Sequence, residues 1–258
     1  MSFIKTNISD KVFCITLNRP DKFNSFNREM ALQMQEALNN ADEDKSIRAI
    51  FITGAGKAFC AGQDLSEAIS PDGPGIKKIV QEHYNPIIRM IRHIEKPIVC
   101  AVNGVAAGAG ANIALACDVI LAAETASFVQ AFSKIGLIPD SGGTFFLPRL
   151  IGFQRASAVM MLGDKVPANV ALLMGMLYKV CTPEKLVDDG MATAVMLSSM
   201  PTKGIGLTKR LLNQSLSNTL EQQLEAEAKE QVAAASTYDY KEGVKAFLEK
   251  RMPDFKGE

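Results

Sequence analysis

Short apolar runs alternate with helical segments over roughly the first half of the chain, and this alternation constrains the possible folds most strongly. Residues 11–17, 47–53, 98–102 and 119–122 are rich in β-branched and apolar side chains, which is typical of buried strands. Strands that are apolar along their whole length occur mainly in sheets with helices on both faces. The sequence therefore predicts the α/β class.

Helical patterns fill the intervals between these runs. In residues 27–41 the apolar side chains recur at helical spacing, and Asn27 is placed to cap the first turn. Residues 76–93 form a second helical pattern, which Pro86 is expected to kink or divide. A third pattern, 110–117, consists mostly of small residues. The segment 69–75 contains two prolines and two glycines, which predicts a mobile connection.

The chain changes character beyond Ile151, where the pattern predicts helices almost throughout. Residues 219–235 are rich in glutamate, glutamine and alanine, and such exposed helices often serve contacts between subunits. We expect a core domain over residues 1–195. A helical C-terminal region over 196–258 is expected to make oligomer contacts.

The charge balance argues against a nucleic-acid-binding protein. Lysine plus arginine is 28, aspartate plus glutamate is 28, and the formal net charge is zero, whereas affinity for nucleic acid needs a basic surface. Net charge does not describe the distribution of charge, so a local basic patch for a phosphorylated ligand stays open.

Membrane insertion, export and disulfide formation are not expected. The apolar stretch 98–123 is interrupted by Asn103, Asn112 and Asp118, unlike a membrane span, and the first residues lack the pattern of a secretory signal. The cysteines show no CxxC or metal-ligand spacing, so we expect small core residues, no metal site and a cytoplasmic location. They are Cys14, Cys60, Cys100, Cys117 and Cys181.

The first candidate site segment is residues 59–65, FCAGQDL, which follow the apolar run at 47–53. Gly62, beside small residues, lets a ligand approach backbone N–H groups closely. The alternative is an ordinary turn from a strand into a helix.

The second candidate segment is residues 103–112, NGVAAGAGAN, between a strand and a helix. Free N–H donors at the start of a helix can bind phosphate or polarise a carbonyl group. The nucleotide-binding glycine patterns do not match here. The alternative is close packing of a helix on a strand, which small residues also permit.

The third candidate segment is residues 136–144, GLIPDSGGT, which contains Asp140. An aspartate among apolar residues and glycines is a candidate general base, because burial destabilises its ionised form. The alternatives are a plain turn residue or a cap for a helix that starts near Ser141.

Together these segments resemble one known family. The motifs LNRPDKFNSF, FCAGQDL, VNGVAAGAGANIALACDVILA, FSKIGLIPDSGGTFFLPRLIG and GVKAFLEKRMPDFKG follow one another along the whole chain, which is identified on them as a member of the crotonase (enoyl-CoA hydratase/isomerase) superfamily. The resemblance implies an α/β fold with a repeated ββα core, a helical C-terminal region, and homotrimers that often pair into hexamers. It also implies an oxyanion hole in which the backbone N–H groups of Gln63 and Ala109 hold the thioester carbonyl of an acyl-CoA.

The acidic residues decide between the chemistries of this family. Its hydratases use two glutamates, at the positions of Asn112 and Phe132 here, and an amide and a benzyl group cannot do that acid–base work. The remaining acid, Asp140, implies an isomerase. The ring-1,2-epoxyphenylacetyl-CoA isomerases are similar throughout, which implies rearrangement of that epoxide to an oxepin-CoA; the same site suits a double-bond shift in an unsaturated acyl-CoA. An enoyl-CoA hydratase and a non-catalytic acyl-CoA-binding homologue stay open as alternatives.

The resemblance also implies where the substrate lies. Coenzyme A would run along the backbone near Phe23 and Ala61, and Phe247 and Lys250 would reach it from the C-terminal helix of the same or a neighbouring subunit. Because coenzyme A is part of the substrate, no separate cofactor is expected. The other implied substrate contacts are Gly62, Asp64, Leu65, Gly108, Asn112 and Phe132. For Asp64 the alternative is support of its loop, and for Phe132 it is core packing.

Other chemistries fit the sequence poorly. His83 and His93 are ten residues apart, which does not suit a shared metal site, and Ser141 has no histidine near it in sequence to activate it. The chain contains no tryptophan, which argues against the aspartate-nucleophile dehalogenases of the family.

Overall fold

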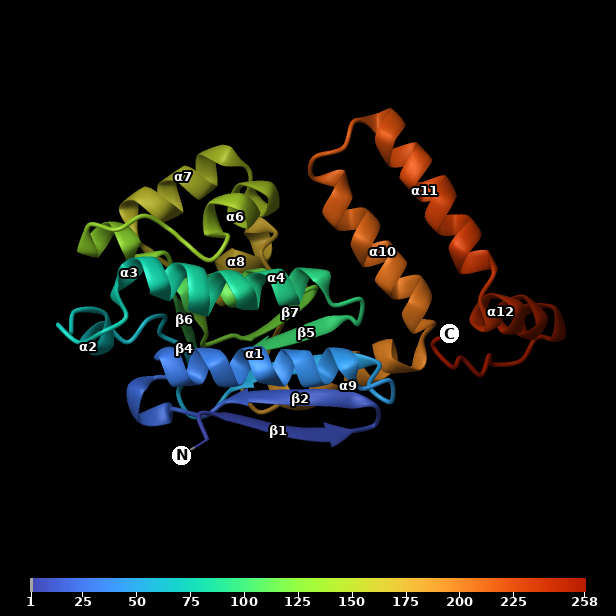
Figure 1. The fold of residues 1–258 in the computed structure, drawn as a ribbon, viewed down its shortest axis with the longest axis horizontal. Helices are drawn as coiled ribbons and strands as arrows, with labels where there is room; N and C mark the ends of the chain where they lie inside the picture. Colours follow the sequence, from blue (N-terminus) through green and yellow to red (C-terminus); the bar gives the residue numbers. More distant parts are fainter. Residues whose placement is uncertain (1) are drawn as a thin grey trace.

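A computed structural model describes residues 2–258 and confirms the α/β class (Figure 1). One sheet has six strands in the order β1-β2-β3-β5-β7-β10, and a second has four in the order β4-β6-β8-β9. The strands are β1 Ile4–Ser9, β2 Val12–Leu17, β3 Ala49–Gly54, β4 Ala58–Cys60, β5 Ile98–Val102, β6 Val105–Ala107, β7 Val119–Ala123, β8 Ser127–Val129, β9 Lys165–Pro167 and β10 Lys179–Cys181.

Helices surround and extend these sheets. The α-helices are α1 Arg28–Glu43, α2 Leu65–Ala68, α3 Gly75–Lys78, α4 Asn85–His93, α5 Ala109–Leu115, α6 Gly143–Ile151, α7 Phe153–Leu162, α8 Ala168–Met174, α9 Leu186–Ser199, α10 Thr202–Ser215, α11 Leu220–Ala235 and α12 Tyr238–Glu249. Two 3₁₀ segments, η1 Pro20–Lys22 and η3 Ala131–Ile135, and one π-helical segment, η2 Ile79–Tyr84, complete the described elements.

Three consecutive units give the core a repeated ββα pattern. In each unit a longer strand joins the six-stranded sheet, and the short strand after it joins the four-stranded sheet: β3 then β4, β5 then β6, and β7 then β8. The corresponding strands of the three units pair in parallel in both sheets. The ββα core that the motifs implied is therefore present, and the carboxyl ends of β4, β6 and β8 lie along one edge of the smaller sheet.

The central strands are apolar because the larger sheet is covered by helices. All of β5 is buried, as is β3 except for its last residue. Helix α9 packs across β2, β3, β5 and β7, while α1 and α4 pack against one another and lie in front of the strands in Figure 1. This burial explains why these strands read as continuous hydrophobic runs.

Most of the expected elements of the first 125 residues are confirmed. The four apolar runs form β2, β3, β5 and β7. Asn27 caps α1, since its Oδ1 accepts a hydrogen bond from the N–H of Met30 at 2.9 Å. The pattern at 76–93 is divided, as expected from Pro86, into α3, η2 and α4, with Pro86 in the first turn of α4.

Three details correct the sequence-based expectations. Strand β1 was not predicted, and β9 and β10, which have three residues each, interrupt the mostly helical pattern that was expected beyond Ile151. Runs this short carry no detectable periodicity, and β10 exists because it pairs in parallel with β7. Asp140 does not cap a helix, because α6 begins at Gly143 and is preceded by Gly142.

Helices α10, α11 and α12 form an extension that projects from the core (Figure 1). Lys209 of α10, which is buried, joins the extension to the core through Asp118, with 2.7 Å between Nζ and Oδ2. The predicted division between residues 195 and 196 falls inside α9, and it stays a prediction. Across residues 2–258, no helix is both long and apolar enough to span a membrane.

Candidate active site

The three candidate segments leave the same edge of the four-stranded sheet. Residues 61–64 follow β4, residues 108 and 109 follow β6, and residues 130–140 follow β8. Since β4, β6 and β8 are parallel, their carboxyl ends lie side by side, which is where ligands bind in parallel sheets. The topology therefore gathers segments that are far apart in the sequence.

The backbone N–H of Gln63 is not used in the pairing of its loop with Phe26. Phe26 donates to the carbonyl of Gly62 at 2.7 Å and accepts from the N–H of Asp64 at 2.8 Å, so in this parallel bridge the N–H of Gln63 points away from Phe26. Gly62 has φ +91°, and a Cβ on it would lie 2.9 Å from the carbonyl oxygen of Ala107 and 3.6 Å from the nitrogen of Ala109. Only glycine allows this approach.

The two predicted oxyanion donors thus lie close to one another at the sheet edge. Ala109 is the first residue of α5, and a helix cannot satisfy its own first N–H groups. Within residues 2–258, neither this N–H nor that of Gln63 donates to a protein acceptor. The pair is therefore available to a carbonyl oxygen of a ligand.

Tyr84 holds the side chain of Gln63, and sequence reasoning missed it. Its hydroxyl donates to Oε1 of Gln63 at 2.9 Å, and Nε2 of Gln63 donates to a carboxylate oxygen of Glu67 at 3.0 Å. Tyr84 is fully buried at the end of η2, and burial raises its pKa well above the ordinary value, so the phenol keeps its proton. The one sequence signal was Pro86, which marks the irregular helix that carries this tyrosine; π-helical turns are frequent at functional sites.

Asp64 supports the loop that carries Gln63, as in the alternative to a substrate contact given above. Its carboxylate pairs with Arg19 at 2.7 Å and accepts from the N–H of Ser66 at 3.1 Å, capping α2. On the other side of the loop, the N–H of Ala61 donates to the carbonyl of Phe23 at 2.9 Å. The two backbone segments proposed for coenzyme A therefore lie side by side.

Asp140 is a partly buried acid with one hydroxyl partner. The Ser141 hydroxyl donates to its Oδ1 at 2.8 Å. Burial raises the pKa of Asp140 above its usual range, while the hydrogen bonds from Ser141 and from its own backbone N–H oppose the shift. The negative charge of Asp140 also contributes to the raised pKa of Tyr84, after burial as the main cause.

The two positions that carry glutamates in the hydratases are buried. Phe132 is 7% exposed, and its ring lies 3.6 Å from where a Cβ on Gly108 would stand. Asn112 is fully buried; its Nδ2 donates to the backbone oxygen of Asp140 at 2.8 Å, and its Oδ1 accepts from Nε2 of Gln130 at 2.7 Å. Gln130 was not foreseen, and nothing in the sequence around it marks its partner. The substrate contacts predicted for Gly108, Asn112 and Phe132 stay predictions.

Two other predicted ligand residues lie far from this edge. Phe247, which is 83% exposed, and Lys250 belong to the end of α12, and Figure 1 places α12 at the opposite end of the molecule from α2. A single chain therefore does not bring them to Gln63 or Asp140. Leu65, by contrast, lies half-exposed directly after Asp64.

His83 and the cysteines are buried inside the protein. Within residues 2–258, no group of three or more His, Cys, Asp and Glu side chains is placed to hold a metal ion. His83 is buried, with Nε2 3.3 Å from a guanidinium nitrogen of Arg28. All five cysteines are buried and unpaired, which confirms them as core residues.

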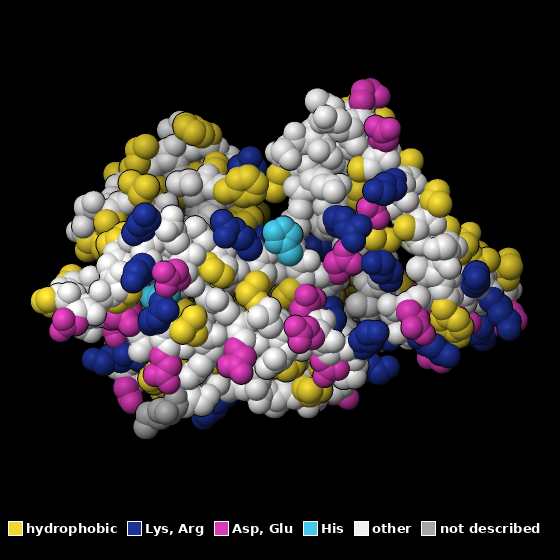
Figure 2. All heavy atoms as spheres, in the orientation of Figure 1, with side chains coloured by type: hydrophobic (Ala, Val, Ile, Leu, Met, Phe, Trp, Pro, Cys, Tyr) yellow, Lys and Arg dark blue, Asp and Glu magenta, His cyan; other side chains and the backbone are white. Residues whose placement is uncertain are grey.

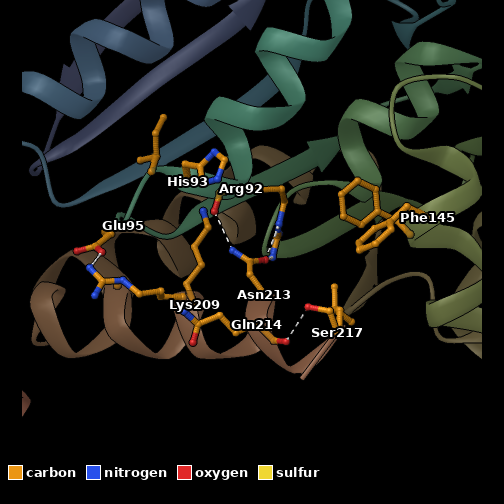
Figure 3. Close-up of a pocket in the computed structure, with 13 residues that line it drawn as sticks. Arg92, His93, Glu95, Phe145, Lys209, Asn213, Gln214 and Ser217 are labelled. Carbon is orange, nitrogen blue, oxygen red and sulfur yellow. Dashed lines mark hydrogen bonds and ion pairs between the residues drawn. The ribbon is translucent and has the colours of Figure 1, made fainter. Parts of the chain in front are cut away.

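A separate cavity of about 590 Å³ lies between α4, α6 and α10 (Figure 3). Arg92 and Lys209 in its wall both face Asp118, at 3.1 and 2.7 Å, and Figure 2 shows basic and acidic side chains interleaved on this face of the molecule. Both cations are paired with Asp118, and they join the core to the extension in the wall of this cavity.

Known proteins match the chain over its whole length. The family described as enoyl-CoA hydratase/isomerase matches residues 7–258. The 1,2-epoxyphenylacetyl-CoA isomerase of Escherichia coli (strain K12) is 46% identical, over 100% of this chain and 99% of that protein. The trans-2-decenoyl-acyl-carrier-protein isomerase of Streptococcus mutans is 37% identical, over 97% of each. The crystal structure of an enoyl-CoA hydratase from Bacillus anthracis superposes with a TM-score of 0.92 at 32% identity and covers 100% of both chains. The chain therefore belongs to the enoyl-CoA hydratase/isomerase family and has its crotonase-like fold.

Proposed function

We propose that this protein is an acyl-CoA isomerase in which the backbone N–H groups of Gln63 and Ala109 form the oxyanion hole and Asp140 is the acid/base. The observation that carries the proposal is the convergence of two unpaired backbone donors and one partly buried carboxyl at a single sheet edge. The two positions where a hydratase has glutamates hold an amide and a phenyl ring.

The two N–H donors and the single carboxyl group together suit a proton-transfer reaction. A thioester carbonyl between two preset donors can take up negative charge as an enolate, and each donor of this kind stabilises the transition state by roughly 3 kcal/mol. Asp140, as a carboxylate, takes a proton from one carbon and returns it to another. Its raised pKa makes it a stronger base than an ordinary aspartate. Ordered addition of water would need a second acid, which these positions do not supply.

Apolar side chains around the site suit a hydrophobic acyl group. Leu65 and Ile69 follow the Gln63 loop, and Leu137 and Ile138 precede Asp140; all four are exposed, and clustered exposed apolar residues mark binding surfaces. The relative from Escherichia coli is named for 1,2-epoxyphenylacetyl-CoA. We extend that substrate to this chain, with rearrangement of the epoxide to an oxepin-CoA, or a double-bond shift in an unsaturated acyl-CoA. Coenzyme A enters as part of the substrate, and the proposal includes no other cofactor.

The proposal includes an oligomer. Coenzyme A would lie along Phe23 and Ala61, while Phe247 and Lys250 sit at the far end of the same chain. A complete site that uses both sets requires α12 of a neighbouring subunit, as in a homotrimer or a dimer of trimers. We also propose a cytoplasmic location, which rests on the cysteine pattern of the sequence.

The test is a mass-resolved assay of the purified protein with a panel of acyl-CoA thioesters in ¹⁸O-labelled water. We expect isomerised product with neither label nor mass gain. Asp140→Asn should abolish turnover and leave acyl-CoA binding intact, while Asp164→Asn, at an exposed aspartate outside the site, should change neither. Near-full activity of Asp140→Asn would refute the role of Asp140.

The same assay separates the alternatives. A product heavier by one water would establish a hydratase, the activity named for the Bacillus anthracis structure. Tight acyl-CoA binding with no turnover of any thioester would instead establish a non-catalytic binding protein.

A further inference from the structure

A short chain of buried amides ends on the backbone of Asp140. Gln130, 2% exposed, donates from Nε2 to Oδ1 of Asn112 at 2.7 Å, and Asn112, fully buried, donates from Nδ2 to the carbonyl oxygen of Asp140 at 2.8 Å. The same carbonyl accepts from the N–H of Gly143 at 2.9 Å. Both donors to this carbonyl come from groups that are themselves held in place.

We infer that Gln130 and Asn112 are positioning residues that orient Asp140 for proton transfer, an inference that rests on the proposed function. An asparagine amide can face its partner with either end. The backbone carbonyl of Asp140 can only accept, so the NH₂ group of Asn112 must face it, and Oδ1 of Asn112 is held on the other side by the donor from Gln130. The orientation of the Asp140 peptide is thereby set from β8, which precedes Gln130, and from α5, which carries Asn112.

The next residue holds the carboxyl group from the other side. Ser141 has φ +52°, in the left-handed region that non-glycine residues seldom adopt, and its hydroxyl donates to Oδ1 of Asp140 at 2.8 Å. The carbonyl and the carboxyl of Asp140 therefore have separate anchors. Such redundancy fixes the direction of a side chain that must meet a substrate carbon.

Gln130 is placed poorly for a purely structural role. Its Oε1 is buried and has no hydrogen-bond partner within residues 2–258. A buried unpaired acceptor is unfavourable for stability, and an apolar side chain of similar size would avoid it. The feature of Gln130 that an apolar residue cannot replace is the N–H bond to Asn112.

This separation of roles defines the first test, Gln130→Met against the matched control Gln33→Met. Gln130→Met removes the donor and the unpaired acceptor, so we expect an unchanged or higher Tm, a KM within about twofold of wild type, and a kcat at least tenfold lower, because small misplacements of a catalytic group are costly. Gln33 accepts from the N–H groups of Phe3 and Ile4, at 2.8 and 3.1 Å. Its replacement should lower Tm and leave kcat unchanged.

The second test is Asn112→Asp, which keeps the shape of the side chain and removes the N–H donor to Asp140. We expect a loss of kcat of about a hundredfold with little change in KM, again measured beside Tm. The amide of Asn112 packs directly against Gly143, since a Cβ on Gly143 would lie 2.5 Å from its Nδ2.

Wild-type kcat in both Gln130→Met and Asn112→Asp would overturn the inference, as would losses of kcat that only follow losses of Tm. The outcome is separable from that of the proposed function. If Asp140→Asn is inactive while Gln130→Met and Asn112→Asp are both fully active, only the positioning role of Gln130 and Asn112 is wrong. If Asp140→Asn is active, the proposed function fails first.

Discussion

Asp140 combines two demands that oppose each other, because burial favours its neutral form and a general base must be ionised. Its pKa is raised, chiefly by burial, above the ordinary value of about 3.9. The folded state therefore holds this proton more tightly than the unfolded chain, and the stability tied to it is lost as pH rises through the folded-state pKa. The wild-type protein is therefore less stable at any pH at which Asp140 is ionised and can act as a base.

Asp140→Asn should accordingly be more stable than wild type at pH 7, because its amide never ionises. The difference in Tm should shrink as pH falls and vanish below about pH 3.9, where the wild-type carboxyl is neutral in both states. Thermal unfolding of the two proteins across this range is the measurement. A difference in Tm that does not depend on pH would contradict the assignment of a raised pKa.

At the scale of elements, the oxyanion hole depends on how closely α5 approaches β4. A Cβ on Gly110 would lie 2.5 Å from the carbonyl oxygen of Cys60 and 2.6 Å from its Sγ. Gly110→Ala must push α5 away from β4, and this shifts Ala109 relative to Gln63. We expect a destabilisation of about 1–3 kcal/mol and a loss of kcat of at least tenfold.

The matched control is Gly204→Ala in α10, where the nearest atoms to an added Cβ are 3.9 Å away in Pro201. An alanine inside a helix with room for its methyl group should stabilise the protein by about 0.5–1 kcal/mol without changing kcat. Chemical denaturation and steady-state kinetics on both variants check the pair. Full activity in Gly110→Ala would show that the spacing of α5 and β4 does not set the site.

At the scale of the whole molecule, the proposed site is divided between two distant parts of the structure. The sheet edge with Gln63 and Asp140 lies in the core, and Phe247 and Lys250 lie on α12 in the extension. If α12 serves a neighbouring subunit, two different defective chains can complete one another in a mixed oligomer.

We therefore expect complementation between Asp140→Asn and the double variant Phe247→Ala/Lys250→Ala. The first should be inactive, and the second should have a raised KM for acyl-CoA because it loses an apolar contact and a phosphate partner. Co-expressed in one oligomer, they should yield some sites with the wild-type KM. If the mixture keeps only the raised KM, α12 does not cross between subunits.

Features that depend on residues close together in the chain were determined by the sequence alone. Continuous apolar runs specified β2, β3, β5 and β7, because a strand buried on both faces must be apolar at every position. Asn27 marked its own helix start, since a cap acts within three residues. The ordered motifs specified the family, and Asp140 stood out as the acid left in them.

Properties that depend on partners far away in the chain were decided only by the tertiary structure. The bond between Tyr84 and Gln63 spans 21 residues, and that between Asn112 and Asp140 spans 28. β10 has three residues and exists through its pairing with β7. The distance of α12 from the sheet edge likewise follows from how the extension leaves the core. Hydrophobic periodicity reports which face of an element is buried, whereas a hydrogen bond between two amides on different elements leaves no periodic trace, so the supports of Gln63 and Asp140 emerge only once the sheets are assembled.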